Sequence, residues 1–390
     1  MIRLYKLKDY NFRLVLWVMT LSIIGVLLVN SASSSLTTRH VFGVILGVCL
    51  MVVFSLIDFS WILNFYWVIY FVNIALLVIV LVIGWSTKGA QRWINLGFTK
   101  FQPVELSKIF MILFFARYLM KHLTEINKPR FMIKALVLAG FPLALIFCEP
   151  DLKNTITITI VFAVIYFVSG LSYKFIAILL AILIPLGAIF LVIVTNPNQT
   201  LLKDYQRNRI MAFLYQDDDE YKENNTQQNN SVTAIGSGQL TGKGLNNSDV
   251  SSANKGNFIP EIETDFIFAV AGEELGFLGS AGIIILLLLV ILECIFVSRR
   301  AKDISGVIIC VGVATVISIQ SFINIGVATG ILPNTGTPLP FISYGLSSLE
   351  SLFISIGIVL NVGLQTKVRI SEVRRSQLKA EKKRNVRRKD

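Results

Sequence analysis

Carboxylates and cations stand at a few well-defined places in a chain that is otherwise largely apolar. Asp265 lies in the segment IETDFIF, directly before a long apolar run, and Glu105 and Lys108 lie three residues apart at the start of another run. Arg92 stands beside Trp93 in the polar segment that precedes them. A carboxylate at the water boundary can accept a proton from an attacking hydroxyl, and Lys and Arg bind phosphate groups. These residues predict acid–base chemistry beside a cationic surface for a phosphate group.

The acidic residues at the start of the apolar run that follows Asp265, and Asp265 itself, could also have purely structural roles. Asp265 could be a first-turn acid or a companion of a Thr264 cap, stabilised by the helix dipole. If the helix began there, Glu273 would lie about 80° around it from Asp265, and Glu274 would point roughly the opposite way. A carboxylate at membrane depth costs about 2.5–3.5 kcal/mol. Glu273 and Glu274 therefore need either a Lys or Arg partner or a water-filled cavity, and both remain open.

The cationic cluster also has a simpler explanation. Gln102 and Pro103 would start a helix on which Glu105 and Lys108 share one face, and the buried ammonium of Lys108 would need an acid or an anionic ligand. Trp93 with its neighbouring arginine could belong to an ordinary interfacial aromatic belt. The functional alternative is a wall of positive charge for a phosphate group.

Composition identifies the elements that must position these residues. The 390 residues are 54% hydrophobic and only 15% charged, with a mean hydropathy of +0.68. Apolar runs near the roughly 20 residues needed to cross a bilayer recur along the chain, and they lack the alternation of barrel strands. We expect an all-α polytopic integral membrane protein with ten transmembrane helices. The predicted spans are 12–31, 41–58, 62–84, 104–122, 132–148, 155–171, 175–195, 265–297, 305–330 and 346–365.

The distribution of Lys and Arg predicts the orientation. Basic residues gather before the first span, between the fourth and fifth, between the eighth and ninth, and after the tenth, so both termini are expected in the cytoplasm. The first span lacks a signal-peptidase pattern and is read as a retained helix. Residues 1–366 then form one transmembrane domain, and residues 196–262 form a large extracytoplasmic loop. The motif segments lie on the same extracytoplasmic side.

Two segments outside the spans have a distinctive composition. The tail at 367–390 holds eleven Lys and Arg against three acids, which fits contact with anionic membrane lipid or a solubilising tail equally well and does not indicate nucleic-acid binding. The loop at 196–262 is expected to be flexible in its Asn- and Gln-rich middle. The glycines at 236, 238, 242 and 244 fit tight turns, whereas the spacing around Lys243 does not match a phosphate-binding P-loop.

Several kinds of site are excluded by residue counts. The four cysteines fall in or at the ends of apolar runs and predict no disulfide framework. With only His40 and His122, a histidine-based zinc site or a Ser-His-Asp triad is not available. Carboxylates, lysine, tyrosine or water must carry any acid–base step.

Five segments, in this order, resemble the SEDS family (shape, elongation, division and sporulation), whose members include RodA, FtsW and SpoVE. They are NSASS at 30–34, GAQRWINLG at 89–97, FQPVELSK at 101–108, IPEIETDFIFAVAGEELGFLG at 259–279 and NIGVATGILPNTGTPLPFISYGLSS at 324–348. The resemblance covers essentially the whole chain and favours a RodA-like over an FtsW-like role.

The resemblance implies peptidoglycan polymerisation. Family members transfer a growing glycan from undecaprenyl pyrophosphate onto the GlcNAc 4-hydroxyl of lipid II, outside the cytoplasmic membrane and together with a class B penicillin-binding protein. It implies that Asp265 is the catalytic base. It also implies that Lys108, Arg92 and Trp93 bind substrate or pyrophosphate, to which we add Glu105 and Glu273. A divalent cation, Mg²⁺ or Mn²⁺, would fit beside a diphosphate.

The chain departs from the family pattern at several positions. EPDLKNT at 149–155 replaces the more common QPDLGT, which brings in Glu149 and an outward-facing Lys153. Val104, Gln239 and Leu346 also differ from the usual residues.

Two other functions are compatible with charges in a membrane bundle. A lipid II flippase or transporter would need a midplane cavity and inverted repeats, and no internal repeat is visible. A noncatalytic scaffold that recruits a transpeptidase would tolerate replacement of the charged residues.

Overall fold

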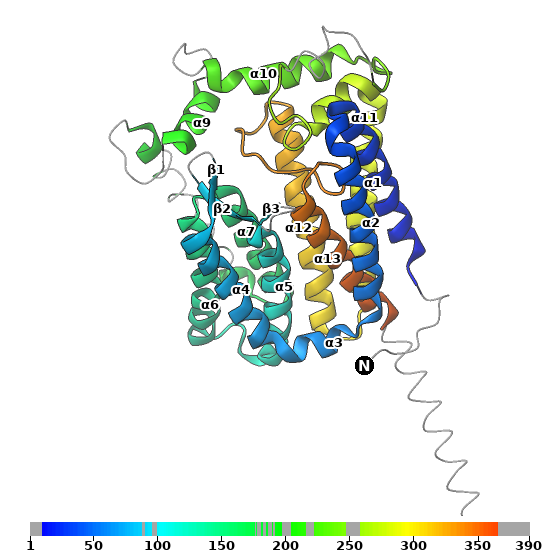
Figure 1. Cartoon of the computed structure of the whole chain (residues 1–390). Coiled ribbons are helices and arrows are strands. Elements are labelled where there is room, and N and C mark those ends of the chain that lie inside the picture. The colour runs from blue at the N-terminus through cyan, green and yellow to red at the C-terminus, as the bar shows by residue number, and fades with distance from the viewer. Residues whose placement is uncertain are drawn as a thin grey trace, which may run out of the picture.

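Apolar runs of membrane-spanning length form helices because a helix pairs its own backbone polar groups, for which lipid offers no partner. The computed structural model describes residues 10–87, 90–95, 100–175, 192–196, 204–215, 222–246 and 258–365, with isolated positions between 177 and 189. Figure 1 shows long helices running side by side as a bundle. The helices of the bundle are α1 (Phe12–Ala32), α2 (Ser34–Leu56), α3 (Phe59–Ile62), α4 (Tyr66–Ile83), α5 (Pro103–Lys121), α6 (Pro129–Cys148), α7 (Leu152–Val168), α11 (Ile267–Arg300), α12 (Ile304–Ala328) and α13 (Leu346–Leu364).

The prediction of a polytopic helical membrane protein is confirmed, and nine of its ten spans coincide with helices of the described chain. In the third span, α3 and α4 are joined by a short 3-10 turn at Leu63–Phe65. Seven helical segments are long and apolar enough to cross a membrane; α5 is not among them because it carries four charged side chains, and α7 is shorter. The predicted span at 175–195 lies largely outside the described residues, so the total of ten stays a prediction.

Three short strands form an element that the sequence did not suggest. β1 (Trp85–Thr87), β2 (Ala90–Asn95) and β3 (Lys100–Phe101) make an antiparallel sheet in the order β1-β2-β3 between α4 and α5. Trp85 is in register with Trp93, and Ile94 with Phe101. The sheet fixes the polar segment that carries Arg92 beside the start of α5.

Burial differs strongly between the helices. Helices α5, α12 and α13 are buried along most of their length, whereas α2, α4 and α6 expose many apolar side chains. Among them are Phe71, Val82, Ile133 and Val137, each more than half exposed. In a bundle of membrane-spanning helices such side chains face lipid. The three buried helices therefore form the centre from which functional side chains can be held rigidly.

The two ends of the described chain lie at the same end of the bundle. The Tyr10 hydroxyl donates to Ser55 Oγ (3.0 Å), and Asn361 Nδ2 of α13 donates to the Ser55 carbonyl (2.8 Å). At the opposite end, α10 (Lys222–Ser237) lies across the bundle, with α9 (Asp204–Leu214) beside it (Figure 1). Which end faces the cytoplasm stays a prediction.

The Asn- and Gln-rich stretch at 224–230 lies within helix α10, and the expectation of a flexible segment there was wrong. Its polar side chains bind the carbonyls that a helix leaves unpaired at its C-terminal end. Gln228 Nε2 donates to the carbonyls of Val327 (2.8 Å) and Leu332 (2.7 Å), and Ser231 Oγ donates to that of Ala328 (2.8 Å). Composition suggested disorder because these side chains lack apolar surface, but they serve as caps for α12.

The glycine-rich segment after α10 packs against a break in α11. Gly276 interrupts α11 with φ 66° and ψ −164°. Lys243 N donates to the Glu273 carbonyl (3.0 Å) and Gly244 N to that of Glu274 (3.0 Å), so the loop supplies hydrogen bonds that the broken helix cannot make. A Cβ at Gly242 would lie 2.1 Å from the Glu274 oxygen. Gly238 and Gly242 therefore allow close approach to the chain's own backbone, as the turn interpretation expects, whereas Gly236 lies inside α10, where the expectation of a turn was wrong.

Candidate functional site

Residues from four polar segments, at 89–108, 149–155, 260–279 and 334–348, meet at the end of the bundle that α10 covers, as expected if these segments share one side of the membrane. Gln102 at the start of α5 donates its backbone N–H to Ser347 Oγ of α13 (3.1 Å) and its side-chain Nε2 to Asp151 Oδ2 (3.4 Å). Tyr344 N donates to the Glu263 carbonyl (2.9 Å). The predicted convergence is confirmed. It arises because the starts of α5, α7, α11 and α13 lie at one end of an antiparallel bundle.

Glu105 and Lys108 form a buried ion pair in the first two turns of α5. Lys108 Nζ lies 2.9 Å from Glu105 Oε2, and each side chain is only 3% exposed. Pro103 at the first helical position starts the helix and brings the i, i+3 pair onto one face. The predicted partner of Lys108 is thus Glu105. Because an ammonium has three N–H donors, Lys108 can donate to an anion as well as to Glu105.

Arg92 lies on β2 and binds the connection between α6 and α7. Its Nε donates to the Glu149 carbonyl (3.3 Å), a terminal nitrogen donates to the Pro150 carbonyl, and Nε lies 3.9 Å from Asp151 Oδ2. The side chain is 20% exposed, so the guanidinium reaches the surface of the site. Trp93, its neighbour on β2, is half-buried.

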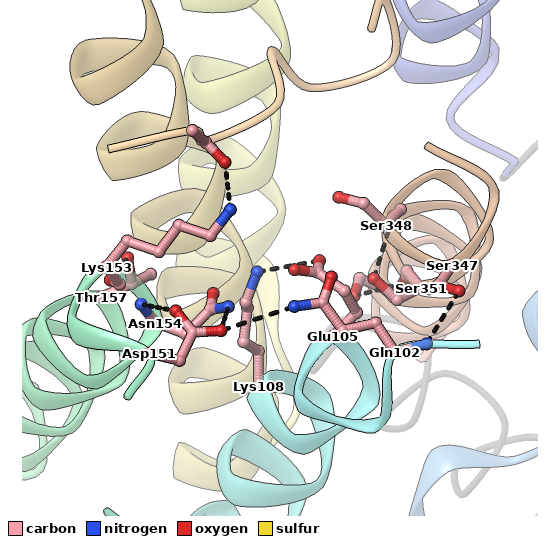
Figure 2. A network of polar contacts seen from close by, with 12 residues as sticks. Gln102, Glu105, Lys108, Asp151, Lys153, Asn154, Thr157, Ser347, Ser348 and Ser351 are labelled. Atoms are coloured by element: carbon pink, nitrogen blue, oxygen red, sulfur yellow. Dashed lines mark hydrogen bonds and ion pairs between the residues drawn. The ribbon is translucent and has the colours of Figure 1, made fainter. Parts of the chain in front are cut away.

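Asp151 joins Arg92 and Gln102 into one network, and the Glu105–Lys108 pair lies beside it (Figure 2). It caps α7 by accepting from Asn154 N (3.3 Å), and its Oδ2 accepts from Asn154 Nδ2 (2.9 Å) as well as from Gln102. In Figure 2 the Lys108 side chain lies between Asp151 and Asn154 on one side and Glu105 on the other. A fully buried carboxylate is stabilised here by a helix N-terminus, two amide donors and the nearby guanidinium of Arg92.

Asp265 lies in a turn, and helix α11 begins only at Ile267. The helical-wheel relation to Glu273 and the Thr264 cap are therefore wrong, since the N-cap position is Phe266 and Thr264 Oγ1 bonds to the Glu261 carbonyl (3.1 Å). Ser343 stabilises the turn, because its Oγ donates to the Thr264 carbonyl (2.6 Å). Asp265 is partly exposed, as a proton acceptor must be.

The loop between α12 and α13 positions Asp265 from the other side. A Cβ built on Gly336, which has φ +70°, would lie 2.8 Å from Asp265 Oδ2. Asn324 Nδ2 of α12 bridges the two segments by donating to the carbonyls of Asp265 (2.9 Å) and Thr337 (2.7 Å). Lys153 Nζ of α7 donates to the Gly336 carbonyl (Figure 2). Asp265 thus connects through Gly336 and α7 to the Asp151 network.

Glu273 and Glu274 belong to a different set of contacts. Lys243 Nζ of the glycine-rich loop lies 2.8 Å from Glu273 Oε1, and the Glu273 side chain is 2% exposed. Ser31 Oγ of α1 donates to Glu274 Oε1. A cavity of about 290 Å³ beside the Lys243–Glu273 pair is lined mainly by α10. The structure therefore separates Glu273 from the network of Lys108 and Arg92 and gives it the structural partner considered above.

Glu149 is a buried acid beside this network. It follows α6 and is 1% exposed, and its Oε1 has no hydrogen-bond partner among the described residues. Burial, together with the negative charge of Asp151, raises the pKa of Glu149 to about 8, and the positive charge of Arg92 opposes the shift. The carboxyl is therefore mostly protonated at neutral pH.

Few side chains that could bind a divalent cation lie close together in the described part of the chain. No group of three or more His, Cys, Asp or Glu side chains converges there. Mg²⁺ is commonly bound through one or two carboxylates, with waters and substrate phosphates completing its shell. Asp265 fits such a cation only if the substrate supplies the remaining ligands.

Several residues of the site were not singled out from the sequence. Asn324, 1% exposed, joins the Asp265 turn to the α12–α13 loop, and Gln102 joins α5 to α7. An asparagine inside an apolar run was the available signal for Asn324, because a buried amide needs partners. Gly336 and Lys153 lay within motif segments, but nothing in their spacing indicated that they meet.

Relatives of known name match over most of the chain. The peptidoglycan glycosyltransferase MrdB of Escherichia coli K12 is 36% identical over 303 residues, which cover 77% of this chain and 78% of that protein. The probable peptidoglycan glycosyltransferase FtsW of Geobacter metallireducens is 34% identical over 390 residues, covering 94% and 98%. Relatives of both names match at similar identity.

Solved structures show the same fold. A chain from a peptidoglycan synthase complex, described as coordinating polymerization and crosslinking, superposes with a TM-score of 0.74 at 27% identity, covering 91% of this chain and 97% of that chain. The rod shape determining protein RodA of Thermus thermophilus superposes with a TM-score of 0.67 at 25% identity, covering 91% and 96%. The FtsW, RodA and SpoVE family of cell cycle proteins matches residues 10–368, and this chain belongs to that family.

Proposed function

We propose that this protein is a peptidoglycan glycosyltransferase that joins lipid II disaccharide units into glycan strands at the outer face of the bacterial cytoplasmic membrane. Relatives that this chain matches over most of their length carry that enzyme name. The observation that carries the proposal is the meeting of a partly exposed carboxylate, Asp265, with a network containing Lys108 and Arg92 at one end of a membrane bundle.

Asp265 is the proposed general base. Its carboxylate accepts the proton of the GlcNAc 4-hydroxyl of lipid II while that oxygen attacks the anomeric carbon of the donor glycan. The new glycosidic bond forms as the bond to the diphosphate oxygen breaks, and undecaprenyl pyrophosphate leaves with the electron pair. A positioned base contributes about 10²- to 10⁴-fold to such a step.

Lys108 and Arg92 are proposed to stabilise the departing diphosphate. Glu105 holds the Lys108 ammonium in place, and the Glu149 and Pro150 carbonyls orient the Arg92 guanidinium. Cations oriented in advance stabilise negative charge that develops in the transition state without the cost of reorganisation. Trp93 would contact the substrate at headgroup level. A divalent cation held by Asp265 and substrate phosphates would supply further positive charge.

The membrane location fits a substrate that is anchored in lipid. A site at the end of the bundle lets the isoprenoid carrier stay among the apolar helices while the sugars remain in water. We propose a class B penicillin-binding protein as partner, since a similar chain comes from a complex described as coordinating polymerization and crosslinking.

Purified protein in liposomes with lipid II tests the proposal. The wild type should produce glycan strands, and Asp265→Asn should lower the rate at least about 100-fold with an unchanged melting temperature. Movement of labelled lipid II across the bilayer without polymer would favour a flippase. Normal cell growth with a polymerisation-dead Asp265→Asn variant would favour a scaffold.

A further inference from the structure

Lys153 makes a contact that the proposed mechanism does not yet use. It lies in the first turn of α7, two residues after the cap Asp151, and its ammonium donates to the Gly336 carbonyl. Lys153 lies in the segment EPDLKNT, which departs from the more common QPDLGT of the family. Because Gly336 also lies against the Asp265 carboxylate, the ammonium and the carboxylate contact the same residue from two elements.

The residue that they share belongs to a long irregular segment. Residues 329–345 between α12 and α13 contain no helix or strand. Such loops keep a defined conformation only where specific contacts restrain them. Gln228 binds the Leu332 carbonyl, Asn334 Nδ2 donates to Gln227 Oε1 (3.2 Å), and Asn324 binds Thr337. These restraints come from α10 and α12.

The Asp265 turn holds the end of the loop through Ser343 and Tyr344, and Lys153 restrains the loop from the side of α7. Its hydrogen bond carries the positive charge of the donor, which makes it stronger than a neutral amide bond. The helix that bears it is fixed by the Asp151 cap to the same network as Lys108. A displacement of Gly336 would free the space that now limits the Asp265 carboxylate.

We propose that Lys153 is a positioning residue, which holds Gly336 against Asp265 and so keeps the base aimed at the acceptor hydroxyl. This inference rests on the proposed function of Asp265. Loss of the restraint should lower kcat and leave lipid II binding intact, because misplacement by about 1 Å can cost roughly 100-fold in rate.

The test compares Lys153→Met, which removes the ammonium at similar length, with Lys153→Arg, which keeps a cationic donor. Polymerisation is measured in liposomes as kcat and KM for lipid II. We expect Lys153→Met to lower kcat about 10- to 100-fold with KM within about twofold, and Lys153→Arg to recover most of the rate. Amide hydrogen exchange at 335–337 should rise in the Met variant. Lys128→Met, an exposed charge between α5 and α6, is the control and should behave as wild type.

Other outcomes overturn the inference. Unchanged kcat in Lys153→Met, or a rise in KM alone, would show that Lys153 does not position the base. If the Met variant does not fold, Lys153→Leu, which likewise lacks an N–H donor, takes its place under the same criteria. Asp265→Asn is assayed in parallel: activity in that variant defeats the proposed base itself, whereas its inactivity beside a normal Lys153→Met defeats only the positioning role.

Discussion

At the scale of single residues, the site contains ionisable groups that burial affects differently. Glu105 and Lys108 neutralise each other, Asp151 is stabilised by a helix N-terminus and amide donors, and Glu149 is held as a neutral acid. Asp265, in contrast to these three buried acids, is partly exposed and lies in a turn. The local environment, rather than residue type, therefore separates the proposed base from the other acids.

Glu149→Gln should remove a pH dependence of stability. The folded pKa of Glu149, about 8, is above its ordinary value of 4.5, so the native state binds the proton more tightly. Its stabilising effect is complete below pH 4.5 and is lost as the pH rises to about 8, with a slope of at most about 1.4 kcal/mol per pH unit. Thermal unfolding in detergent between pH 5.5 and 8.5 should show the variant gaining on wild type. A constant difference would contradict the buried neutral acid.

Lys108→Met should destabilise the fold by about 3–5 kcal/mol, because Glu105 would remain as an unpaired buried charge. The double variant Glu105→Met, Lys108→Met should recover most of that loss, since an apolar pair of similar volume is often neutral or stabilising. Polymerisation should stay low in both variants if Lys108 stabilises the diphosphate. Melting temperature and glycan synthesis measured together separate the two effects; a double variant with normal synthesis would remove Lys108 from the mechanism.

At the scale of elements, short polar segments complete the ends and breaks of apolar helices. Helix α10 caps the last carbonyls of α12, and the loop at 238–244 pairs with the backbone around the break in α11. These contacts pair backbone N–H and C=O groups that are buried where the segments pack together. The break at Gly276 is a kink in α11. The first part of the helix, which follows the Asp265 segment, therefore has a different direction from the long lipid-facing part.

Gly242→Ala should destabilise the loop that supports this break. The residue has φ +79°, and the added Cβ would lie 2.1 Å from the Glu274 oxygen. A cost of about 1–3 kcal/mol is expected from the backbone strain. Gly236→Ala in α10, where nothing lies within 4 Å, is the matched control and should be neutral or slightly stabilising. Chemical unfolding in detergent compares the two, and equal stability would show that the loop is not fixed on α11.

At the scale of the whole molecule, the bundle has two chemically different ends. The ends of the described chain and the basic connection between α5 and α6 lie at one end, and the Asp265 network and α10 lie at the other. A lipid-linked donor, its acceptor and a partner enzyme can approach the second end from water or along the bilayer.

Cysteine labelling tests the proposed orientation. In a variant without the native cysteines, Asn95→Cys next to the start of α5 should react with a membrane-impermeant maleimide added to spheroplasts. Lys128→Cys between α5 and α6 should react only after permeabilisation. Both side chains are exposed, so access to the reagent depends on the side of the membrane. The reverse pattern would place the site in the cytoplasm and exclude the proposed substrate.

The sequence by itself determined the helical membrane fold, because apolar length and the backbone's need for hydrogen bonds leave few alternatives in lipid. It also predicted the Glu105–Lys108 pair, since an i, i+3 spacing on one helix is a local property. The polar segments that carry Asp265, Arg92 and Lys108 meet at one end of the bundle, as expected from their common side of the predicted spans, whereas the grouping of these three residues as one site stays a prediction.

Only the tertiary structure decided which of these groups have partners. It paired Glu273 with Lys243 from a distant loop, placed Gly336 against Asp265, and brought Lys153 from α7 to the same loop. The Asn- and Gln-rich stretch formed a helix because the end of α12 offers its side chains acceptors. Such contacts join residues tens to hundreds of positions apart, so no local pattern of hydropathy or charge encodes them.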